Sequence, residues 1–298
     1  MVTTSVLEQI LAAKRANPYA SEKTIEQLRE EHRSGGAKVP LPNETNYCKV
    51  DVGGIHCEWV ESINAKSNQV FLFLHGGGYY RGSSEATRPT AAKVSKASGM
   101  RCLSVNYRLA PEHPFPAAIE DVYNSYRWLV DQGINAKNIV VGGISAGGGL
   151  TLALLLKLKQ RKEVLPAGAV PISAWTDLTQ SGPSMKDLAA NDPIISKEYL
   201  DRMASYYLGN TPAKTPLASP LFGDISGFPP LLIQVGTAET MMDDSKRLAK
   251  RAIAAGVYVE FEPWQDMFHG WHGSAHILEE AEQAIQSIGR FCHKVLPN

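Results

Sequence analysis

Hydrophobic runs alternate with amphipathic stretches along most of the chain after about residue 45. The hydrophobic runs are short and continuous, a pattern typical of strands buried on both faces of a parallel sheet. We predict six strands, most of them such continuous runs, at residues 69–74, 101–106, 138–142, 168–173, 231–235 and 257–262. Helical patterns lie between and after these strands, at residues 117–131, 146–161, 245–255 and 276–294. This order predicts an α/β fold with a mainly parallel central sheet flanked by helices.

Two regions depart from this alternation. The first 35 residues carry two short amphipathic helical patterns, at 5–16 and 21–32, and a Gly- and Pro-containing linker at 35–42 follows them. A second region, rich in Pro, Ser and Asp, surrounds one helical pattern at 196–208. We interpret the chain as an N-terminal helical cap segment (1–45) and a main domain (46–298), within which residues 177–228 contribute a cap insert.

Composition narrows the class of protein. Thirty Lys+Arg balance 30 Asp+Glu, and a formal net charge of zero argues against a nucleic-acid-binding protein. The N-terminus lacks the pattern of a secretory signal and no stretch is long enough to span a membrane, so we predict a cytoplasmic protein. The four cysteines show no metal-ligand spacing and are expected to be reduced thiols. A disulfide between Cys48 and Cys57, across a hairpin turning at Gly53-Gly54, is the alternative.

Glycine is concentrated in two short windows. Of 25 glycines, nine fall within residues 75–82 and 142–149. In the second window, Ser145 stands between Gly143 and Gly147, after a hydrophobic strand and before a hydrophobic helix. This is the setting of a nucleophile elbow, where a tight turn exposes a serine at a helix N-terminus. The alternative is a glycine-rich turn that contains an incidental serine.

The first window, His75-Gly76-Gly77-Gly78, follows the strand predicted at residues 69–74. Consecutive glycines allow several backbone N–H groups to converge on one point, as an oxyanion hole requires. An ordinary tight turn is one alternative. Nucleotide binding is another, but neither window contains GxGxxG or GxxxxGK[ST].

Three motifs occur in order: His75 to Gly78, Tyr107 to Ala118, and Gly143-Ile144-Ser145-Ala146-Gly147-Gly148. Together they closely resemble the hormone-sensitive-lipase family of α/β-hydrolases, the bacterial family IV carboxylesterases, from about residue 45 to the C-terminus. The resemblance implies an α/β-hydrolase fold and a serine carboxylesterase that hydrolyses short-chain acyl esters, bound between cap and core. It also implies that the enzyme uses no cofactor, and that the chain forms a homodimer as many family members do. Ile144 departs from the family, which often has Asp there.

The general base should follow the serine and the acid in the sequence. His269, in Met267-Phe268-His269-Gly270-Trp271, lies where the family has its catalytic His-Gly-aromatic sequence. His272 and His276 raise the alternative of a metal cluster. Gly270 and Gly273 interrupt the helical spacing, and no carboxylate or cysteine pair supports such a cluster, so we predict no metal. His75 and His113 are interpreted as structural.

The triad acid should follow the strand predicted at residues 231–235. The family pattern Asp-x-x-x-Asp aligns Glu239 with the catalytic position and Asp243 with the second position. A Glu can orient the imidazole and stabilise the imidazolium as an Asp does. We favour Glu239 as the triad acid, and Asp243 is the alternative acid. A third interpretation is that Glu239 is not catalytic and only caps the following helix.

The resulting hypothesis is ester hydrolysis through an acyl-enzyme. His269 takes the proton of Ser145, and the amides of Gly77, Gly78 and Ala146 hold the oxyanion. Hydrophobic candidates for the substrate pocket are Tyr79, Trp175, Met203, Tyr207 and Phe268. Two other functions stay open: a non-catalytic small-molecule-binding protein, since the family resembles certain plant hormone receptors that lack the base, and a peptidase or amidase on the same fold.

Overall fold

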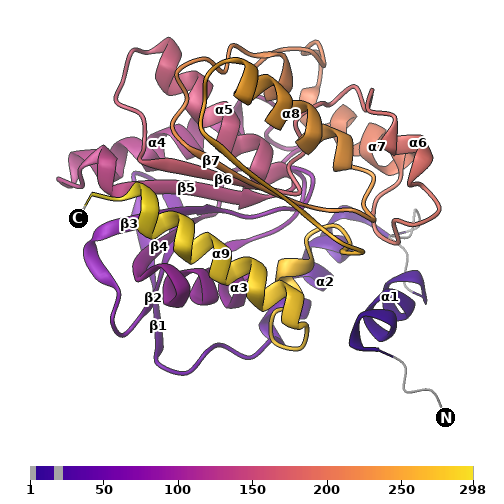
Figure 1. Ribbon diagram of the computed structural model, residues 1–298, viewed down its shortest axis with the longest axis horizontal. Coiled ribbons are helices and arrows are strands. Elements are labelled where there is room, and N and C mark those ends of the chain that lie inside the picture. Colours follow the sequence, from indigo (N-terminus) through magenta and orange to yellow (C-terminus); the bar gives the residue numbers. More distant parts are fainter. Residues whose placement is uncertain (1–4, 17–22, 298) are drawn as a thin grey trace.

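The structure, a computed structural model, describes residues 5–16 and 23–297 (Figure 1). Within these ranges the strands form one eight-stranded sheet in the order β1-β2-β4-β3-β5-β6-β7-β8. The strands are β1 (Thr45–Val52), β2 (Ile55–Ser62), β3 (Lys66–Leu74), β4 (Met100–Val105), β5 (Ile139–Ile144), β6 (Gly168–Ile172), β7 (Leu231–Gly236) and β8 (Val259–Trp264). Strands β3 to β8 pair in parallel, whereas β1 and β2 pair antiparallel with each other and β2 with β4. The predicted mainly parallel α/β sheet is confirmed.

Helices cover both faces of the sheet (Figure 1). Side chains of β3 alternate between the two layers: Phe71 and Phe73 pack with α3 (Ser84–Ser98) and α9 (Glu279–Val295). Leu72 and Leu74 pack in the opposite layer, with α4 (Ala117–Asp131), α5 (Ala146–Gln160) and α8 (Met242–Ala254). Nearly all of α5 is buried, which explains why its sequence is hydrophobic almost all round.

The N-terminal segment lies at one end of this sandwich, together with the insert at 177–228 (Figure 1). The segment contains α1 (Val6–Ala16) and α2 (Ile25–Ala37). The insert contains α6 (Ser184–Asp187), α7 (Lys197–Leu208) and the short 3-10 helix η2 (Pro220–Phe222). Two further 3-10 helices are η1 (Ala136–Asn138) and η3 (Trp271–Ser274). Part of the predicted N-terminal cap, at 1–4 and 17–22, lies outside the described residues.

Helix α2 is anchored to the core by one side chain and one glycine. The Arg29 guanidinium donates to the Tyr80 and Ala110 carbonyls and forms a two-point ion pair with Glu112. The linker expected to begin at residue 35 is instead the last turn of α2. This turn packs closely on α3: a Cβ on Gly36 would lie 2.1 Å from the Ala86 carbonyl oxygen, so only glycine allows the approach.

The hairpin β1–β2 turns at Gly53-Gly54, which is the turn expected for a disulfide between Cys48 and Cys57. Its register pairs Cys48 with Trp59 and Val50 with Cys57, so the two cysteines do not face each other. All four cysteines are free thiols, which corrects that alternative. None of the helices in the described part of the chain is long and hydrophobic enough to cross a membrane.

Candidate active site

Ser145 occupies a strained turn between β5 and α5. Its φ of 59° and ψ of −118° are unusual for a residue with a side chain, and such strain is concentrated at functional sites. A Cβ on Gly147 would lie 2.1 Å from the Leu74 carbonyl oxygen, and one on Gly143 would lie 2.5 Å from the same atom. The turn therefore packs directly against the end of β3, and neither flanking glycine can carry a side chain.

His269 follows β8 in the loop before η3, and its imidazole meets Glu239 in the loop after β7. His269 Nδ1 and Glu239 Oε2 lie 2.6 Å apart. The other oxygen of this fully buried carboxylate, Oε1, accepts hydrogen bonds from Gly236 N–H and from the Ser173 hydroxyl, both at 2.7 Å. The carboxylate is thus fixed on both oxygens, and one edge of the imidazole is fixed with it.

The surroundings of His269 act on its pKa in opposite directions. Burial lowers the pKa, but the charge of Glu239 and its hydrogen bond outweigh burial and raise the pKa above its ordinary value. Asp192, in the insert, contributes in the same direction. The ring is therefore held as a stronger base than a free histidine.

Asp243, the alternative acid, has a different partner. Its Oδ2 accepts a hydrogen bond from the backbone N–H of Ser184, the first residue of α6, at 2.7 Å. Asp243 thus holds the start of α6, and of the two candidate carboxylates it is Glu239 that contacts His269.

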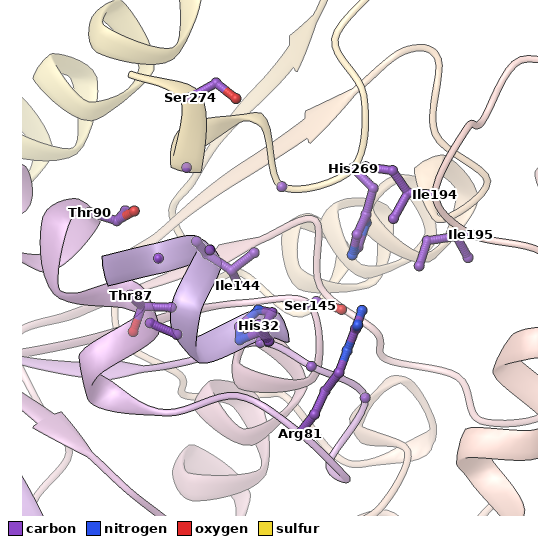
Figure 2. Close-up of a pocket in the computed structure, with 18 of the residues that line it drawn as sticks. His32, Arg81, Thr87, Thr90, Ile144, Ser145, Ile194, Ile195, His269 and Ser274 are labelled. Carbon is purple, nitrogen blue, oxygen red and sulfur yellow. The ribbon is translucent and has the colours of Figure 1, made fainter. Parts of the chain in front are cut away.

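Ser145 and His269 line one cavity of about 420 Å³. In Figure 2 the His269 ring points toward Ser145 from the opposite side of this cavity. Among the described residues no hydrogen bond joins Ser145 Oγ to the imidazole. Such bonds are often long without substrate and tighten when substrate binds.

The turn after β3 passes directly over the elbow. A Cβ on Gly76 would lie 2.9 Å from the Ile144 carbonyl oxygen and 3.4 Å from Ser145 Cβ. Gly77 and Gly78 both adopt positive φ and line the cavity. In the described chain their N–H groups donate to no backbone carbonyl, and the N–H of Ala146, as the first residue of α5, has no partner within the helix. Three N–H groups are thus available beside Ser145.

His75 supports this turn from beneath. Its ring stacks on Tyr107 at a centroid distance of 4.1 Å, and its Nδ1 donates to the Gly76 carbonyl. Tyr107 in turn donates from its hydroxyl to the His75 carbonyl. Burial lowers the pKa of His75 to about 4, so the ring is neutral near pH 7.

The other histidines of the C-terminal cluster lie apart from His269. His272 is buried and hydrogen-bonds through Nε2 to the Gln234 side chain, and burial lowers its pKa to about 3. His276 is exposed. The described residues contain no group of three or more His, Cys, Asp or Glu side chains arranged to hold a metal ion.

The predicted pocket residues fall into two groups. Met203 and Phe268 line the cavity. Tyr79, Trp175 and Tyr207 do not, which corrects that part of the expectation. These three residues pack on one another in the core, with Tyr79 stacked on Tyr207 at 3.7 Å, because their large rings fill the space between the turn after β3 and helix α7.

The cavity wall also contains residues without a sequence signal. His32 reaches it from α2, Ile194 and Ile195 from the insert, and Arg81 from the turn after β3 (Figure 2). Lys14 of α1 also lines the cavity. Ser173, which holds Glu239 but does not line the cavity, likewise carries no sequence signal. No motif or spacing singles these residues out, since only the folded chain brings them together.

Comparison with known proteins agrees with this geometry. A family model described as the alpha/beta hydrolase fold matches residues 71–273. An acetyl-hydrolase from Streptomyces hygroscopicus is 42% identical over 242 residues, which cover 81% of this chain and 81% of that protein. An esterase from the bacterial hormone-sensitive lipase family has a crystal structure with a TM-score of 0.96 and 41% identity, covering 100% of both chains. The structure of EstE5 soaked with p-nitrophenyl butyrate has a TM-score of 0.93 and 38% identity, covering 98% of this chain and 99% of that one.

Proposed function

This chain belongs to the bacterial hormone-sensitive-lipase family of α/β-hydrolases and is a carboxylic ester hydrolase; we propose that it cleaves short acyl esters through a Ser145–His269–Glu239 triad and an acyl-enzyme. The observation that carries the proposal is the 2.6 Å contact between His269 Nδ1 and the buried Glu239 carboxylate, since His269 and the strained Ser145 line the same cavity. A base that is held by an acid and shares a cavity with a serine is the arrangement that activates the serine hydroxyl.

In the first step His269 Nε2 takes the proton of Ser145 as Oγ attacks the ester carbonyl. Glu239 holds Nδ1–H, which leaves Nε2 free to accept the proton, and its negative charge stabilises the imidazolium that forms. The same imidazolium then gives its proton to the leaving alcohol. Water repeats the sequence on the acyl-enzyme and releases the acid.

The oxyanion of both tetrahedral intermediates is bound by the amides of Gly77, Gly78 and Ala146. The proposal is supported by the positive φ of Gly77 and Gly78, which turns the backbone at the cavity, and by the three N–H groups, which donate to no backbone carbonyl in the described chain. Donors fixed before the reaction are what lowers the barrier, because no reorganisation is needed when the charge develops.

The N-terminal segment and the insert serve together as a cap over the ester. Residues from α1, α2 and α7 line the cavity opposite Ser145, so substrate lies between these helices and the sheet. A volume of about 420 Å³ suits a small ester rather than a long acyl chain. The similarity to EstE5, whose crystals were soaked with p-nitrophenyl butyrate, favours the same class. A homodimer and a cytoplasmic location stay predictions.

The proposal is tested with p-nitrophenyl esters of rising acyl length, assayed with the wild type and with Ser145→Ala and Glu239→Ala. We expect the highest kcat/KM for short acyl groups and no measurable burst of p-nitrophenol from Ser145→Ala. An inert wild type, or a Ser145→Ala variant that keeps its rate, would exclude the proposed mechanism.

A further inference from the structure

Asp192 connects the insert to the loop that carries the proposed acid. The residue lies between α6 and α7 and is buried. Its Oδ2 accepts hydrogen bonds from the N–H and the hydroxyl of Thr240, at 2.9 and 3.1 Å, and Thr240 directly follows Glu239. Its Oδ1 accepts hydrogen bonds from the N–H groups of Ile194 and Ile195, both at 2.9 Å. One carboxylate thus holds the acid loop with one oxygen and the insert with the other.

The part of the insert that Asp192 holds is a wall of the cavity. Ile194 and Ile195 line this cavity together with Ser145 and His269. Figure 2 shows both isoleucines on the side of the cavity from which His269 points toward Ser145. Their side chains are hydrophobic, so they occupy space beside the reacting groups without offering a hydrogen bond. The position of this wall therefore limits how large a group of the ester fits there.

A second contact between the insert and the acid loop lacks this connection to the cavity. The Ser184 hydroxyl donates to the Thr240 carbonyl at 2.5 Å. Ser184 is the first residue of α6, and no residue of α6 lines the cavity. Hydrogen bonds of the described chain thus attach the insert to Thr240 through both Ser184 and Asp192. Of these two attachments, the one through Asp192 carries the cavity wall.

The Asp192 carboxylate also acts on His269 through its charge. In the described part of the chain no hydrogen bond joins the two side chains. Burial lowers the pKa of His269. The negative charges of Glu239 and Asp192 raise this pKa, and the positive charge of Lys14 lowers it. Asp192 therefore favours, from the insert, the imidazolium that forms when Ser145 loses its proton.

Building on the proposed function, we propose that Asp192 is a positioning residue that fixes the wall of Ile194 and Ile195 relative to the acid loop and thereby makes the enzyme selective for small esters. The carboxylate suits this role because each of its oxygens accepts two hydrogen bonds. An amide has one acceptor oxygen and one donor group, so an Asn here can accept the bonds of one side only. A loosened wall should admit larger groups, with little change for small ones.

The test measures selectivity between small and large esters. In the acyl arm, p-nitrophenyl butyrate is compared with p-nitrophenyl octanoate. In the alcohol arm, ethyl butyrate is compared with hexyl butyrate. Selectivity is the ratio of kcat/KM for the small ester to kcat/KM for the large ester, measured in the wild type, Asp192→Asn, Thr240→Val and Asp224→Asn. Asp224 is a matched control, because this insert carboxylate also accepts hydrogen bonds from a residue two positions later but does not line the cavity.

We expect the wild type to prefer the small ester, and Asp192→Asn to lower the selectivity of at least one arm about tenfold, as for other hydrophobic walls that discriminate by size. Thr240→Val removes one hydrogen bond and keeps the charge of Asp192. It should lower the selectivity by about two- to fivefold, and it carries the test if Asp192→Asn does not fold. Asp224→Asn should keep the selectivity of the wild type. The arm that changes identifies the part of the ester that meets the wall.

Two further measurements separate positioning from a general structural role. In Asp192→Asn the midpoint of the rise of kcat/KM with pH should move to lower pH, because the lost charge no longer raises the pKa of His269. In Thr240→Val this midpoint should stay in place. Ile194→Ala removes part of the wall directly. Combined with Asp192→Asn, it should lose less selectivity than the two single losses multiplied, because both changes act on the same wall.

Four outcomes would overturn the proposal. The first is a wild type without preference for the small ester in either arm, and the second is a selectivity that Asp192→Asn and Thr240→Val leave unchanged. The third is an equal loss of kcat/KM for small and large esters at an unchanged midpoint pH, which would indicate a general structural role. The fourth is a pair of losses in Asp192→Asn and Ile194→Ala that multiply in full. Failure of the proposed function is distinguishable from all four, because neither arm would then show hydrolysis that depends on Ser145.

Discussion

The two glycine-rich turns carry the two halves of the proposed machinery, but they are held by different parts of the molecule. At the elbow, the atoms that exclude a side chain from Gly143 and Gly147 are all backbone atoms: those of Gly147 itself, of Leu74 at the end of β3, and of His75, which follows it. At the turn after β3, the atom closest to a Cβ on Gly78 is Met203 Sδ, at 2.0 Å, from helix α7 of the insert. The nucleophile is thus fixed by backbone at the end of the sheet, whereas Gly78, one of the proposed oxyanion donors, lies against a flexible side chain of the insert.

The proposed acid and base, like the elbow, are held by residues at the ends of sheet strands. Glu239 is held by Gly236 at the end of β7 and by Ser173 at the end of β6. Proton transfer therefore depends on the rigid edge of a parallel sheet. Oxyanion binding depends in addition on how the insert packs over the turn, so changes in the insert should alter rate before they alter stability.

Replacing the acid should have the largest effect on rate. Glu239→Gln keeps the size of the side chain but removes the charge that stabilises the imidazolium, and we expect kcat to fall about 10⁴-fold. Asp243→Asn is the matched control, because Asp243 holds the start of α6 and does not contact His269. Its kcat should stay within about threefold of the wild type, with a stability loss of about 1 kcal/mol. Equal losses in the two variants would show that Asp243 shares the role of the acid.

Gly147→Ala should produce the largest loss of stability. The new Cβ would lie 2.1 Å from the Leu74 carbonyl oxygen, and strand backbone cannot move aside. We therefore expect the free energy of unfolding to fall by about 3 kcal/mol or more. Gly35→Ala serves as the control, because a Cβ there meets no atom outside its own helix within 4 Å. Alanine also favours helix over glycine, so this change should raise the free energy of unfolding by about 0.5–1 kcal/mol. Denaturant unfolding measures both. An unaffected Gly147→Ala would contradict the view that the sheet fixes the elbow.

Gly78→Ala tests the other half of the comparison. Met203 can move aside, so only the positive φ of residue 78 should cost stability, about 1 kcal/mol. The displaced amides should nevertheless reduce kcat by about 10- to 100-fold. Adding Met203→Ala to this variant should restore part of the rate, since it removes the clash. If Gly78→Ala destabilised the protein as much as Gly147→Ala, the contrast between the two turns would be lost.

Ser173→Ala should have a smaller effect, because it leaves Glu239 in place but removes one of its hydrogen bonds. The Ser173 hydroxyl donates to Glu239 Oε1 and accepts a longer bond, 3.3 Å, from the N–H of Gly270, beside His269. We expect kcat to fall about tenfold, with KM unchanged, as the acid becomes less firmly oriented. A purely structural role predicts instead a loss of stability with an unchanged kcat.

The pH profile offers the smallest but most specific effect. The neutral imidazole is the base, so kcat/KM should fall as pH is lowered through the pKa of His269. Because Glu239 raises this pKa above its ordinary value of 6.5 despite burial, half of the maximal rate should be reached above pH 6.5. In Glu239→Gln the residual activity should show its midpoint at a lower pH. A rate that stays flat between about pH 5 and 8 would contradict His269 as the base.

Parts of the fold with a strong hydrophobic pattern could be predicted from the sequence. The six predicted strands correspond to β3–β8, and most of them are continuous hydrophobic runs; β8, with Glu260 and Glu262 between hydrophobic residues, is not. The hydrophobic pattern does not predict helix α3. Most of its buried residues are small, and Pro89 lies within it, so the sequence shows no hydrophobic stripe there. Strand β1 is mostly exposed and polar, so no hydrophobic run predicts the hairpin β1–β2. The sequence indicates this hairpin only through the turn at Gly53-Gly54 between Cys48 and Cys57.

The candidate site divides in the same way. Ser145, Glu239 and His269 were predicted because motif and order in the sequence mark them. Ser173 could not be predicted, because its importance comes from contacts between loops that are distant in the sequence. The prediction that Tyr79, Trp175 and Tyr207 line the substrate pocket was wrong, because all three are buried in the core. Hydrophobic character alone does not distinguish a cavity wall from the core behind it.

The central claim is that Ser145 forms a covalent acyl intermediate with His269 as its base. The most direct measurement is peptide mass spectrometry of the enzyme after reaction with a p-nitrophenyl phosphonate, which mimics the tetrahedral intermediate and stays bound. We predict a single adduct on Ser145 that forms with release of one p-nitrophenol per chain and is absent from Ser145→Ala. An adduct on another residue, or continued ester turnover by a chain fully labelled at Ser145, would contradict the claim.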